Sequence, residues 1–474
     1  MTGTVELPLW LVALVLVLAA IAALDRILVP SARWVLRRRM ERLVERVNTR
    51  LVRPIHPFRL LGRADMIVRL THDPRVMEAV VDHARETGVP ESVAFEQARA
   101  YAREIVPAFS ALVYFGFATG MARRISRALY HVRVGPVERA LDGIDPSATI
   151  VFVMNHRSNM DYVLVTWLVA GRSALSYAVG EWARVWPLSW LFRAMGAYFI
   201  RRGYRGTLYR RVLARYVQII TAEGITQAVF PEGGLSLDGR TGAPKMGILS
   251  YIAAGMEQGG RDVVFVPVGI GYDRVLEDRV LVEAAAAGER RFRAGPAAAL
   301  GFVARMLWRI VRQRFPGFGA AAVAFGEPLS LRAFRADHRG AVDAEGLGAA
   351  IMARVAASVP VTPVPLVAAA LAAAPMPRAA LEAAVAATAD RLARRGAILK
   401  LPAGGLAAAA AQGRTALERR GLVAESGGLL GPAPGRGALF AFYAAPVLQM
   451  LDGAGSATAP APVAAEGPPS ARTA

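Results

Sequence analysis

The clearest pattern in the chain is a set of short apolar runs that each end abruptly in polar residues or glycine. The four strongest runs are Thr149–Met154, Gln227–Phe230, Val263–Val268 and Ala321–Phe325. Helical patterns separate them, and strands that alternate with helices are typical of an α/β layer structure. The sequence therefore predicts an α/β domain over this part of the chain.

Helical patterns dominate on both sides of that domain. Before it, Asp73–Ile105 has helical periodicity with a break near Gly88–Pro90, and Ala108–Met121 is too short for a membrane span and is expected to be a core or interfacial helix. After it the chain is rich in Ala and Arg. Two further helices are expected there, between breaks rich in Pro and Gly. The helices are Arg378–Arg395 and Leu406–Arg420, and the breaks are Val359–Pro365 and Gly427–Gly437.

The N-terminus contains a candidate membrane span. Leu7–Leu24 is 18 residues long and carries no charge. As a helix it would be about 27 Å long, just enough to cross a bilayer core. No basic residue precedes it, unlike in a cleaved signal peptide, whereas seven arginines follow it by residue 46. The positive-inside rule then predicts one span in the inner or plasma membrane, with the rest of the chain in the cytoplasm. The alternative is a buried core helix.

These patterns divide the chain into five expected parts. A basic amphipathic helix is predicted at Val35–Val52, and the last residues are small, polar and rich in Pro, as in disordered tails. The expected parts are a transmembrane anchor (1–28), a basic helical region (29–125), an α/β domain (126–335), a helical C-terminal region (336–455) and a disordered tail (456–474).

Composition points to a membrane surface. Hydrophobic residues make up 54% of the chain and the mean hydropathy is +0.34. The net charge is +20, and every basic residue except Lys245 and Lys400 is arginine. This charge favours anionic lipids or phosphates as partners, although a codon bias toward arginine also accounts for part of it. The pattern of an RNA-binding sheet and the spacing of zinc fingers are both absent, so no nucleic-acid partner is expected.

Two residue types refine this picture. The chain has no cysteine, which excludes disulfides, thiolate catalysis and zinc sites built on cysteine. Three tryptophans, Trp182, Trp186 and Trp190, are spaced four apart and would share a face of a helix, although Pro187 bends or ends that helix. This face is expected either to meet lipid or to pack in the core.

The polar residues after the first apolar run are the leading candidates for catalysis. Asn155 to Asp161 reads Asn-His-Arg-Ser-Asn-Met-Asp. His156 and Asp161 would not share a face of one helix, but a turn capped by Ser158 or Asn159 would bring them together. An imidazole held by a carboxylate can take a proton from a hydroxyl group. Alone this spacing is a weak signal, because a buried structural histidine is the commoner explanation.

Three further blocks follow in order. Gly196-Ala-Tyr-Phe-Ile-Arg201-Arg202 ends an apolar run in paired arginines. The next block runs Phe230-Pro-Glu232-Gly233-Gly234-Leu235-Ser236-Leu237-Asp238-Gly239-Arg240 and continues through Pro244-Lys245-Met-Gly-Ile-Leu-Ser250. The last is Val264-Phe-Val-Pro267-Val-Gly-Ile-Gly-Tyr272.

Together the four blocks resemble the glycerolipid acyltransferase superfamily. Its blocks are His-x4-Asp, Gly-x-x-Phe-Ile-x-Arg, Phe-x-Glu-Gly-x-Arg-Ser-Arg and a hydrophobic Pro block. The resemblance is closest to the membrane glycerol-3-phosphate and dihydroxyacetone-phosphate branch, which has Glu-Gly-Gly, Pro-Lys-x-Gly-x-Leu-Ser and Ile-Gly-Tyr. The later Phe325–Ser330 and Phe440–Tyr443 also look like this branch. The resemblance is strong over residues 130–330 and faint beyond.

This resemblance implies a fold and a site. The fold is a glycerol-3-phosphate acyltransferase-like mixed sheet flanked by helices. His156 would be the base and Asp161 the residue that orients it. The substrate-binding candidates are Arg201, Arg202, Glu232, Gly233, Gly234, Ser236, Arg240 and Lys245.

Several roles in this site stay open. Arg201 and Arg202 would either bind the acceptor or face lipid headgroups. Glu232 would contact the acceptor or hydrogen-bond neighbouring backbone amides.

One departure from the family concerns the acceptor. The two arginines of the third block, which help to hold the acceptor's phosphate in the family, fall on Leu235 and Leu237 here. Arg202, Arg240 and Lys245 remain as phosphate ligands, since guanidinium groups suit a phosphate. The departure leaves the acyl-transfer residues intact.

The residues also indicate a mechanism. His156 would deprotonate the acceptor hydroxyl, which attacks an acyl thioester, while amides after His156 or around Gly233–Gly234 support the oxyanion. Neither a cysteine nor a Gly-x-Ser-x-Gly motif is present to carry the acyl group, so direct transfer in a ternary complex is expected. The reaction requires no metal, and no cofactor beyond acyl-CoA or acyl carrier protein as the thioester co-substrate.

The expected function is glycerol-3-phosphate 1-O-acyltransfer at a membrane with anionic lipids. The first alternative is the same chemistry on lysophosphatidate. The second, from another class, is a non-catalytic membrane-surface scaffold, against which the intact His156/Asp161 pair argues.

Overall fold

The structure is a computed structural model of the chain. It describes residues 62–135, 140–170, 173–180, 188–201, 206–256, 259–288, 317–338 and 344–453, together with a few isolated positions. The expected anchor, the basic helix at Val35–Val52 and the expected tail lie largely outside these residues. Within the described part, no helix is both long and apolar enough to cross a membrane.

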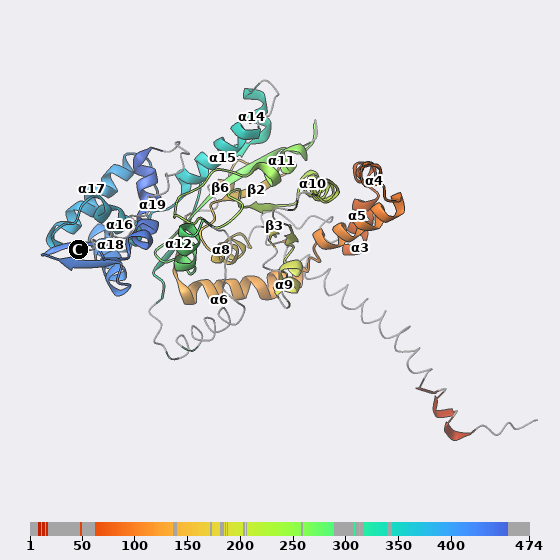
Figure 1. Ribbon diagram of the computed structural model, residues 1–474, viewed down its shortest axis with the longest axis horizontal. Helices are drawn as coiled ribbons and strands as arrows, with labels where there is room; N and C mark the ends of the chain where they lie inside the picture. The colour runs from red at the N-terminus through yellow and green to blue at the C-terminus, as the bar shows by residue number, and fades with distance from the viewer. Residues whose placement is uncertain are drawn as a thin grey trace, which may run out of the picture.

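A mixed sheet of eight strands forms the centre of the molecule (Figure 1). Its order is β1-β7-β6-β2-β5-β3-β4, and β8 pairs with β6. β6 lies parallel to β2 but antiparallel to β7 and β8. The strands are β1 (His131–Val134), β2 (Thr149–Met154), β3 (Ser176–Val179), β4 (Tyr198–Phe199), β5 (Gln227–Val229), β6 (Val263–Tyr272), β7 (Ala320–Phe325) and β8 (Leu329–Ser330). The predicted α/β fold and all four predicted runs are confirmed, and β6 continues past its predicted end to Tyr272.

The central strand β2 is buried on both faces, because its side chains alternate between two cores. Ile150, Phe152 and Met154 point into one core, with α6 (Thr119–Leu129) and α8 (Met160–Val169). Val151 and Val153 point into the other core, which is covered by three helices. These are α10 (Thr207–Ala222), α11 (Met246–Ala254) and α15 (Ala344–Ser358).

The helices before the sheet follow the predicted pattern. They are α3 (Arg63–Thr71), α4 (Pro74–Thr87) and α5 (Glu91–Ile105), and they pack beside α10. α4 ends at Gly88, whose left-handed φ of 72° matches the predicted break. The expected helix at Ala108–Met121 is a π-helical segment, η3 (Leu112–Ala118), that runs directly into α6.

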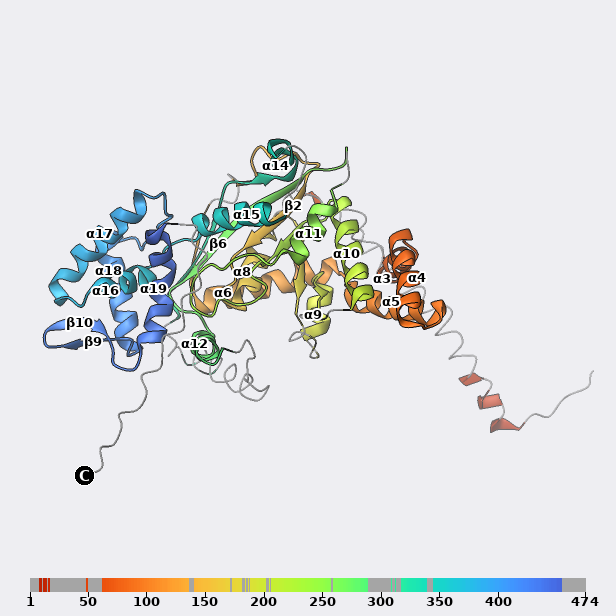
Figure 2. The same cartoon turned by 45° about the horizontal axis from the view of Figure 1, so that its top comes forward.

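The C-terminal region is helical, as expected (Figure 2). It shares with the sheet the core that contains Ile150, Phe152 and Met154, which we call the first core. Its helices are α16 (Pro363–Ala373), η5 (Arg378–Ala380), α17 (Leu381–Ala393), α18 (Gly405–Arg419) and α19 (Gly437–Asp452). It also contains an unpredicted hairpin of β9 (Val423–Ser426) and β10 (Leu429–Pro432). Gly427 and Gly428 turn it with φ of 58° and 74°, as two-residue hairpin turns require.

Two glycines in β6 bring the C-terminal region close to the sheet. A Cβ on Gly269 would lie 2.0 Å from the Ser358 carbonyl oxygen, and one on Gly271 would lie 2.3 Å from that of Pro360. Only glycine permits this approach of two backbones. The segment after α15 therefore lies directly against the strand that ends at Tyr272.

The remaining described helices are α9 (Leu188–Ala194), α12 (Asp278–Ala286) and α14 (Leu331–Asp337).

Candidate active site

The candidate residues gather at one edge of the sheet. Strands β2, β3, β4, β5 and β6 run parallel, so their carboxyl ends share an edge. His156 follows β2, Arg201 follows β4, Glu232 follows β5, and Tyr272 ends β6. Ligands of open α/β sheets bind at such an edge. The topology thus brings together segments that are more than a hundred residues apart in sequence.

The turn after β2 brings His156 and Asp161 into contact, as predicted. The imidazole Nδ1 lies 2.9 Å from Asp161 Oδ2, and the exposed fractions of the two residues are only 2% and 0%. The Phe230 ring lies 4.1 Å from the imidazole centroid, and the edge of Tyr162 packs against the imidazole at 5.4 Å. With Nδ1 committed to Asp161, Nε2 is the imidazole nitrogen that can exchange a proton with a substrate.

The Asp161 carboxylate accepts four hydrogen bonds. Oδ2 accepts from His156 Nδ1 and from the backbone amides of Arg157 at 2.7 Å and Ser158 at 3.0 Å. Oδ1 accepts from the Tyr272 hydroxyl at 2.7 Å. These four donors satisfy the buried carboxylate, and its contact with Nδ1 holds the imidazole in the Nδ1–H tautomer.

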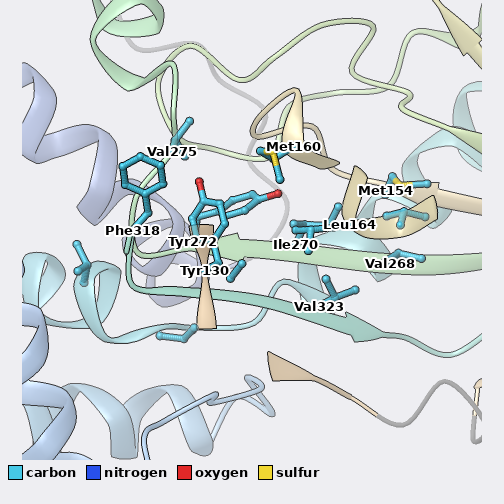
Figure 3. Close-up of a cluster of buried hydrophobic side chains, with 14 of the residues drawn as sticks. Tyr130, Met154, Met160, Leu164, Val268, Ile270, Tyr272, Val275, Phe318 and Val323 are labelled. Atoms are coloured by element: carbon cyan, nitrogen blue, oxygen red, sulfur yellow. The ribbon is translucent and has the colours of Figure 1, made fainter. Parts of the chain in front are cut away.

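Tyr272 was not predicted as a site residue. Figure 3 shows its ring beside that of Tyr130, and their centroids lie 5.3 Å apart. Burial, together with the charge of Asp161, raises the pKa of the Tyr272 hydroxyl well above 10, so it remains a donor at neutral pH. Its position at the end of the Ile-Gly-Tyr strand was the one available signal, because the hydrogen bond joins residues 111 apart.

Glu277 is the second residue that sequence reasoning missed. Its Oε2 accepts from Ser158 Oγ at 2.8 Å, and its Oε1 accepts from the amide and the side chain of Asn159 at 3.2 and 3.0 Å. Ser158 Oγ in turn accepts from the Met160 amide at 3.1 Å, and of the two predicted caps Asn159 holds the N-cap position of α8, without a side-chain capping bond. Glu277 therefore fixes the far side of the catalytic turn.

These bonds correct the expectation that amides after His156 form the oxyanion hole. The amides of Arg157 and Ser158 donate to Asp161, that of Asn159 to Glu277, and that of Met160 to Ser158. In the glycine-rich turn, the Gly233 amide donates to Phe230 O at 3.0 Å, whereas the Gly234 amide has no acceptor among the described residues. Gly234 is therefore the remaining candidate donor from the predicted set.

Glu232 hydrogen-bonds backbone amides, the structural alternative left open above. Oε1 accepts from the His156 amide at 3.0 Å and Oε2 from the Gly242 amide at 3.2 Å. Burial raises the pKa of Glu232 to about 7 against the opposing effect of these bonds. Ser236 also holds His156, because the Ser236 amide donates to His156 O at 2.8 Å. The Oγ of Ser236 donates to Arg240 O at 2.7 Å.

The candidate cations differ in their partners. Arg201 makes a two-pronged ion pair with Glu104 of α5, with its Nε at 2.9 and 3.1 Å, and packs against Tyr101, Tyr204 and Tyr209. Hydrogen bonding to Glu104 raises the pKa of Arg201 above its ordinary value. The guanidinium of Arg240 is half-buried and has no acidic partner among the described residues. Arg202 lies outside the described residues.

The other residues of the third block are also placed. Lys245 is exposed, and its side chain lies over Gly233, where a Cβ would meet Lys245 Cδ at 2.7 Å. Gly233 has a left-handed φ of 68°. Leu235, one of the two leucines at family arginine positions, is 8% exposed and belongs to the first core, and Leu237 is half-buried against it.

Known proteins with similar sequences carry the same kind of domains. A family model described as Acyltransferase matches residues 137–271. Another, described as Glycerol-3-phosphate acyltransferase C-terminal region, matches residues 303–444.

Individual relatives agree with these matches. Proteins named glycerol-3-phosphate acyltransferase from Alteromonas mediterranea and Pseudomonas entomophila are 29% and 30% identical over 59% and 57% of this chain. One from Pasteurella multocida is 30% identical over 59% of it. These matches cover 33%, 32% and 34% of the relatives, so the chain spans about a third of their length.

The chain also matches a solved structure, the 1-acyl-sn-glycerophosphate (LPA) acyltransferase from Thermotoga maritima. The match covers 49% of this chain and 72% of the chain of that protein. The sequence identity is 19% and the TM-score is 0.32. The two family models together span more than half of the chain, in the order expected from its motifs. The chain therefore carries an acyltransferase domain followed by a glycerol-3-phosphate acyltransferase C-terminal region.

Proposed function

We propose that this chain transfers a fatty acyl group from an acyl thioester to the sn-1 hydroxyl of glycerol 3-phosphate. The observation that carries the proposal is the buried His156–Asp161 pair, 2.9 Å apart at the carboxyl edge of the sheet. The names of the relatives and the C-terminal family match support this acceptor. The donor is acyl-CoA or acyl carrier protein loaded with a fatty acid.

The proposed reaction is one direct transfer. His156 Nε2 removes the proton of the acceptor hydroxyl as the oxygen attacks the thioester carbonyl. The C–S bond then breaks, the ester forms, and the thiol leaves with a proton returned from the imidazolium. Asp161 stabilises the transient imidazolium without taking its proton. The amide of Gly234 is the proposed donor to the developing oxyanion.

The acceptor's phosphate needs cations that no protein acid already neutralises. Arg240 meets this requirement in the described part of the chain, and Lys245 leads the neighbouring helix α11. We propose that these two residues and Arg202 bind the phosphate. The ion pair of Arg201 with Glu104 assigns Arg201 instead to the support of this edge of the sheet.

Lysophosphatidate is the second candidate acceptor. The half-buried Leu237 lies three residues before Arg240, at a position where the family has an arginine. An apolar side chain beside a phosphate-binding cation suits an acceptor that already carries one acyl chain. The same His156–Asp161 chemistry serves both acceptors.

We further propose that Leu7–Leu24 anchors the chain in the inner or plasma membrane with the catalytic domain in the cytoplasm. The uncharged run and the arginines after it support this orientation. Protease added outside intact cells should leave the bulk of the chain uncut, and removal of residues 1–28 should weaken membrane attachment. Cleavage of the catalytic domain from outside would contradict the orientation.

His156→Ala should lower the acyl-transfer rate by about 10²–10⁴-fold, because the reaction loses its general base. The measurement is kcat with purified protein in detergent, with labelled acyl thioester and glycerol 3-phosphate. The exposed His131, which begins β1, provides the control His131→Ala. Circular dichroism checks that both variants fold. A His156→Ala variant within a few-fold of wild type would remove His156 from the mechanism.

Tyr272→Phe should lower kcat by roughly tenfold to a hundredfold with little change in either KM. The substitution removes one charge-assisted hydrogen bond to Asp161, worth about 1.5–3 kcal/mol, and leaves the substrate contacts in place. Tyr130→Phe is a matched control, because the Tyr130 hydroxyl bonds to Arg274 O and not to Asp161. Equal losses in both variants would show that the ring cluster matters and not the bond to Asp161.

Arg240→Ala should raise KM for glycerol 3-phosphate at least roughly tenfold and leave KM for the thioester nearly unchanged, because one charge-assisted contact to the phosphate is lost. Arg202→Ala should do the same. Arg210→Ala, an exposed position on α10, is the control for the change in net charge.

The two acceptors are distinguished by offering both to Leu237→Arg. Leu235 is too buried for this purpose, because an arginine there would place a charge in the core. Under the proposed function, Leu237→Arg lowers or preserves KM for glycerol 3-phosphate. Loss of activity in a folded Leu237→Arg variant, with faster turnover of lysophosphatidate by wild type, would favour the second acceptor.

A further inference from the structure

We propose that the outer side of η3, α6 and α9 is a docking face for an anionic lipid bilayer, separate from the N-terminal segment. We define the docking face by its exposed apolar side chains, Leu112, Phe117, Ile125 and Trp190. This proposal rests on the proposed function, whose product is a membrane amphiphile, but its test does not use activity.

The arrangement of side chains on α6 is the first observation. The buried residues of α6 are Ala122, Ser126 and Leu129, and the helix packs on α8. The outer side of this continuous η3–α6 segment carries larger apolar residues, Phe117 on η3 and Ile125 on α6, which are 54% and 38% exposed. Together with Met121 they are spaced four apart and form a line along the helix. Large apolar side chains thus point away from the protein although a core lies directly beneath them.

A neighbouring helix extends the same face. Trp190 on α9 is 58% exposed, and Trp186, just before that helix, is 81% exposed. The Ser110 amide donates to Ala194 O at 2.9 Å, which joins the end of α9 to the start of η3. Figures 1 and 2 show α6 and α9 along the same side of the molecule. Of the two expectations for the tryptophan face, core packing is therefore wrong for these two residues, and Trp182 lies outside the described residues.

Charge selects a bilayer as the occupant. Arg123 and Arg124 flank the apolar line, are exposed, and make no ion pair with any acid in the described part of the chain. Arg127 lies over the Trp167 ring at 5.4 Å, and α6 contains no acidic residue. Arginines beside aromatic and aliphatic side chains suit the boundary between anionic headgroups and acyl chains. A second copy of this chain, with a net charge of +20, would instead bring like charges together.

The docking face also lies close to the chemistry. α6 packs on α8, and α8 begins at Met160, within the turn that carries His156 and Asp161. One helix layer therefore separates the docking face from the catalytic turn. A bilayer at this face would hold the turn near the membrane surface, where an amphiphilic product can leave.

The absence of cysteine makes a direct test possible in the full chain. Phe117→Cys and Ile125→Cys are each labelled with a polarity-sensitive fluorophore and placed in vesicles of phosphatidylglycerol and phosphatidylcholine that contain doxyl-labelled lipid. Val93→Cys on α5 and Leu429→Cys on the hairpin are controls of similar exposure, at 53% and 42% for the native side chains. We expect a blue shift and at least about twofold quenching at the two docking-face positions and neither at the controls.

A charge-reversal pair tests the role of the arginines. Arg123→Glu with Arg124→Glu should lower the quenching at position 117 at least about fivefold in anionic vesicles. Arg391→Glu with Arg394→Glu, exposed positions on α17 and at its C-cap, makes the same change in net charge and should leave the quenching intact. Equal effects of both pairs would show a response to net charge alone and would overturn the assignment of this face.

The remaining outcomes are also decisive. Equal quenching at all four labelled positions would remove the docking face. A blue shift without lipid that grows with protein concentration would assign the face to a second copy, and one independent of concentration would assign it to another segment of the same chain. Because fluorescence is the readout, an inactive enzyme that docks would contradict only the proposed function, and an active enzyme that does not dock would contradict only this inference.

Discussion

The Asp161 carboxylate has no solvent contact, and the carboxyl edge of the sheet is arranged around it. Burial of an unpaired ion costs several kcal/mol, so the fold must supply donors on every side. His156 and the amides of Arg157 and Ser158 supply three from one turn, and Tyr272 supplies the fourth from β6. The same bonds that compensate the charge also close the turn, join it to the neighbouring strand and leave the imidazole Nε2 as the free nitrogen.

The C-terminal region supports this turn from outside the sheet. Glu277 holds Ser158 and Asn159, and the adjacent Asp278 accepts hydrogen bonds from Arg420 of the C-terminal region and from the buried Tyr443 of α19. Removal of those helices would expose Asp278 and loosen the segment that carries Glu277. This dependence gives a physical reason for one chain to contain both matched regions, although the residues of the proposed reaction all lie in the first.

The sequence predicts the elements of this fold better than the contacts between them. The β2, β5, β6 and β7 runs were recognisable because they are apolar on both faces, and the His156–Asp161 turn because a strand ends there in polar residues. Tyr272 and Glu277 were missed because each acts through a hydrogen bond across more than a hundred residues. The hairpin at Gly427–Gly428 was predicted to be part of an irregular break after a helix, because paired glycines are typical of such breaks as well as of hairpin turns.

Whether an arginine can bind a phosphate depends on whether a carboxylate or a carbonyl oxygen of the protein already holds its guanidinium group. Arg157 and Arg201 stand beside motif positions, yet Arg157 is buried and donates to Gly239 O, and Arg201 is neutralised by Glu104. Arg240, beside the glycine-rich turn, has a guanidinium without an acidic partner in the part of the chain that the structure describes. The family arginine replaced by Leu235 would stand in the core here, so its loss removes no cation from the space in front of His156. Among the arginines beside the motifs that the structure describes, Arg240 is therefore the one whose guanidinium is not already held by a carboxylate or a carbonyl.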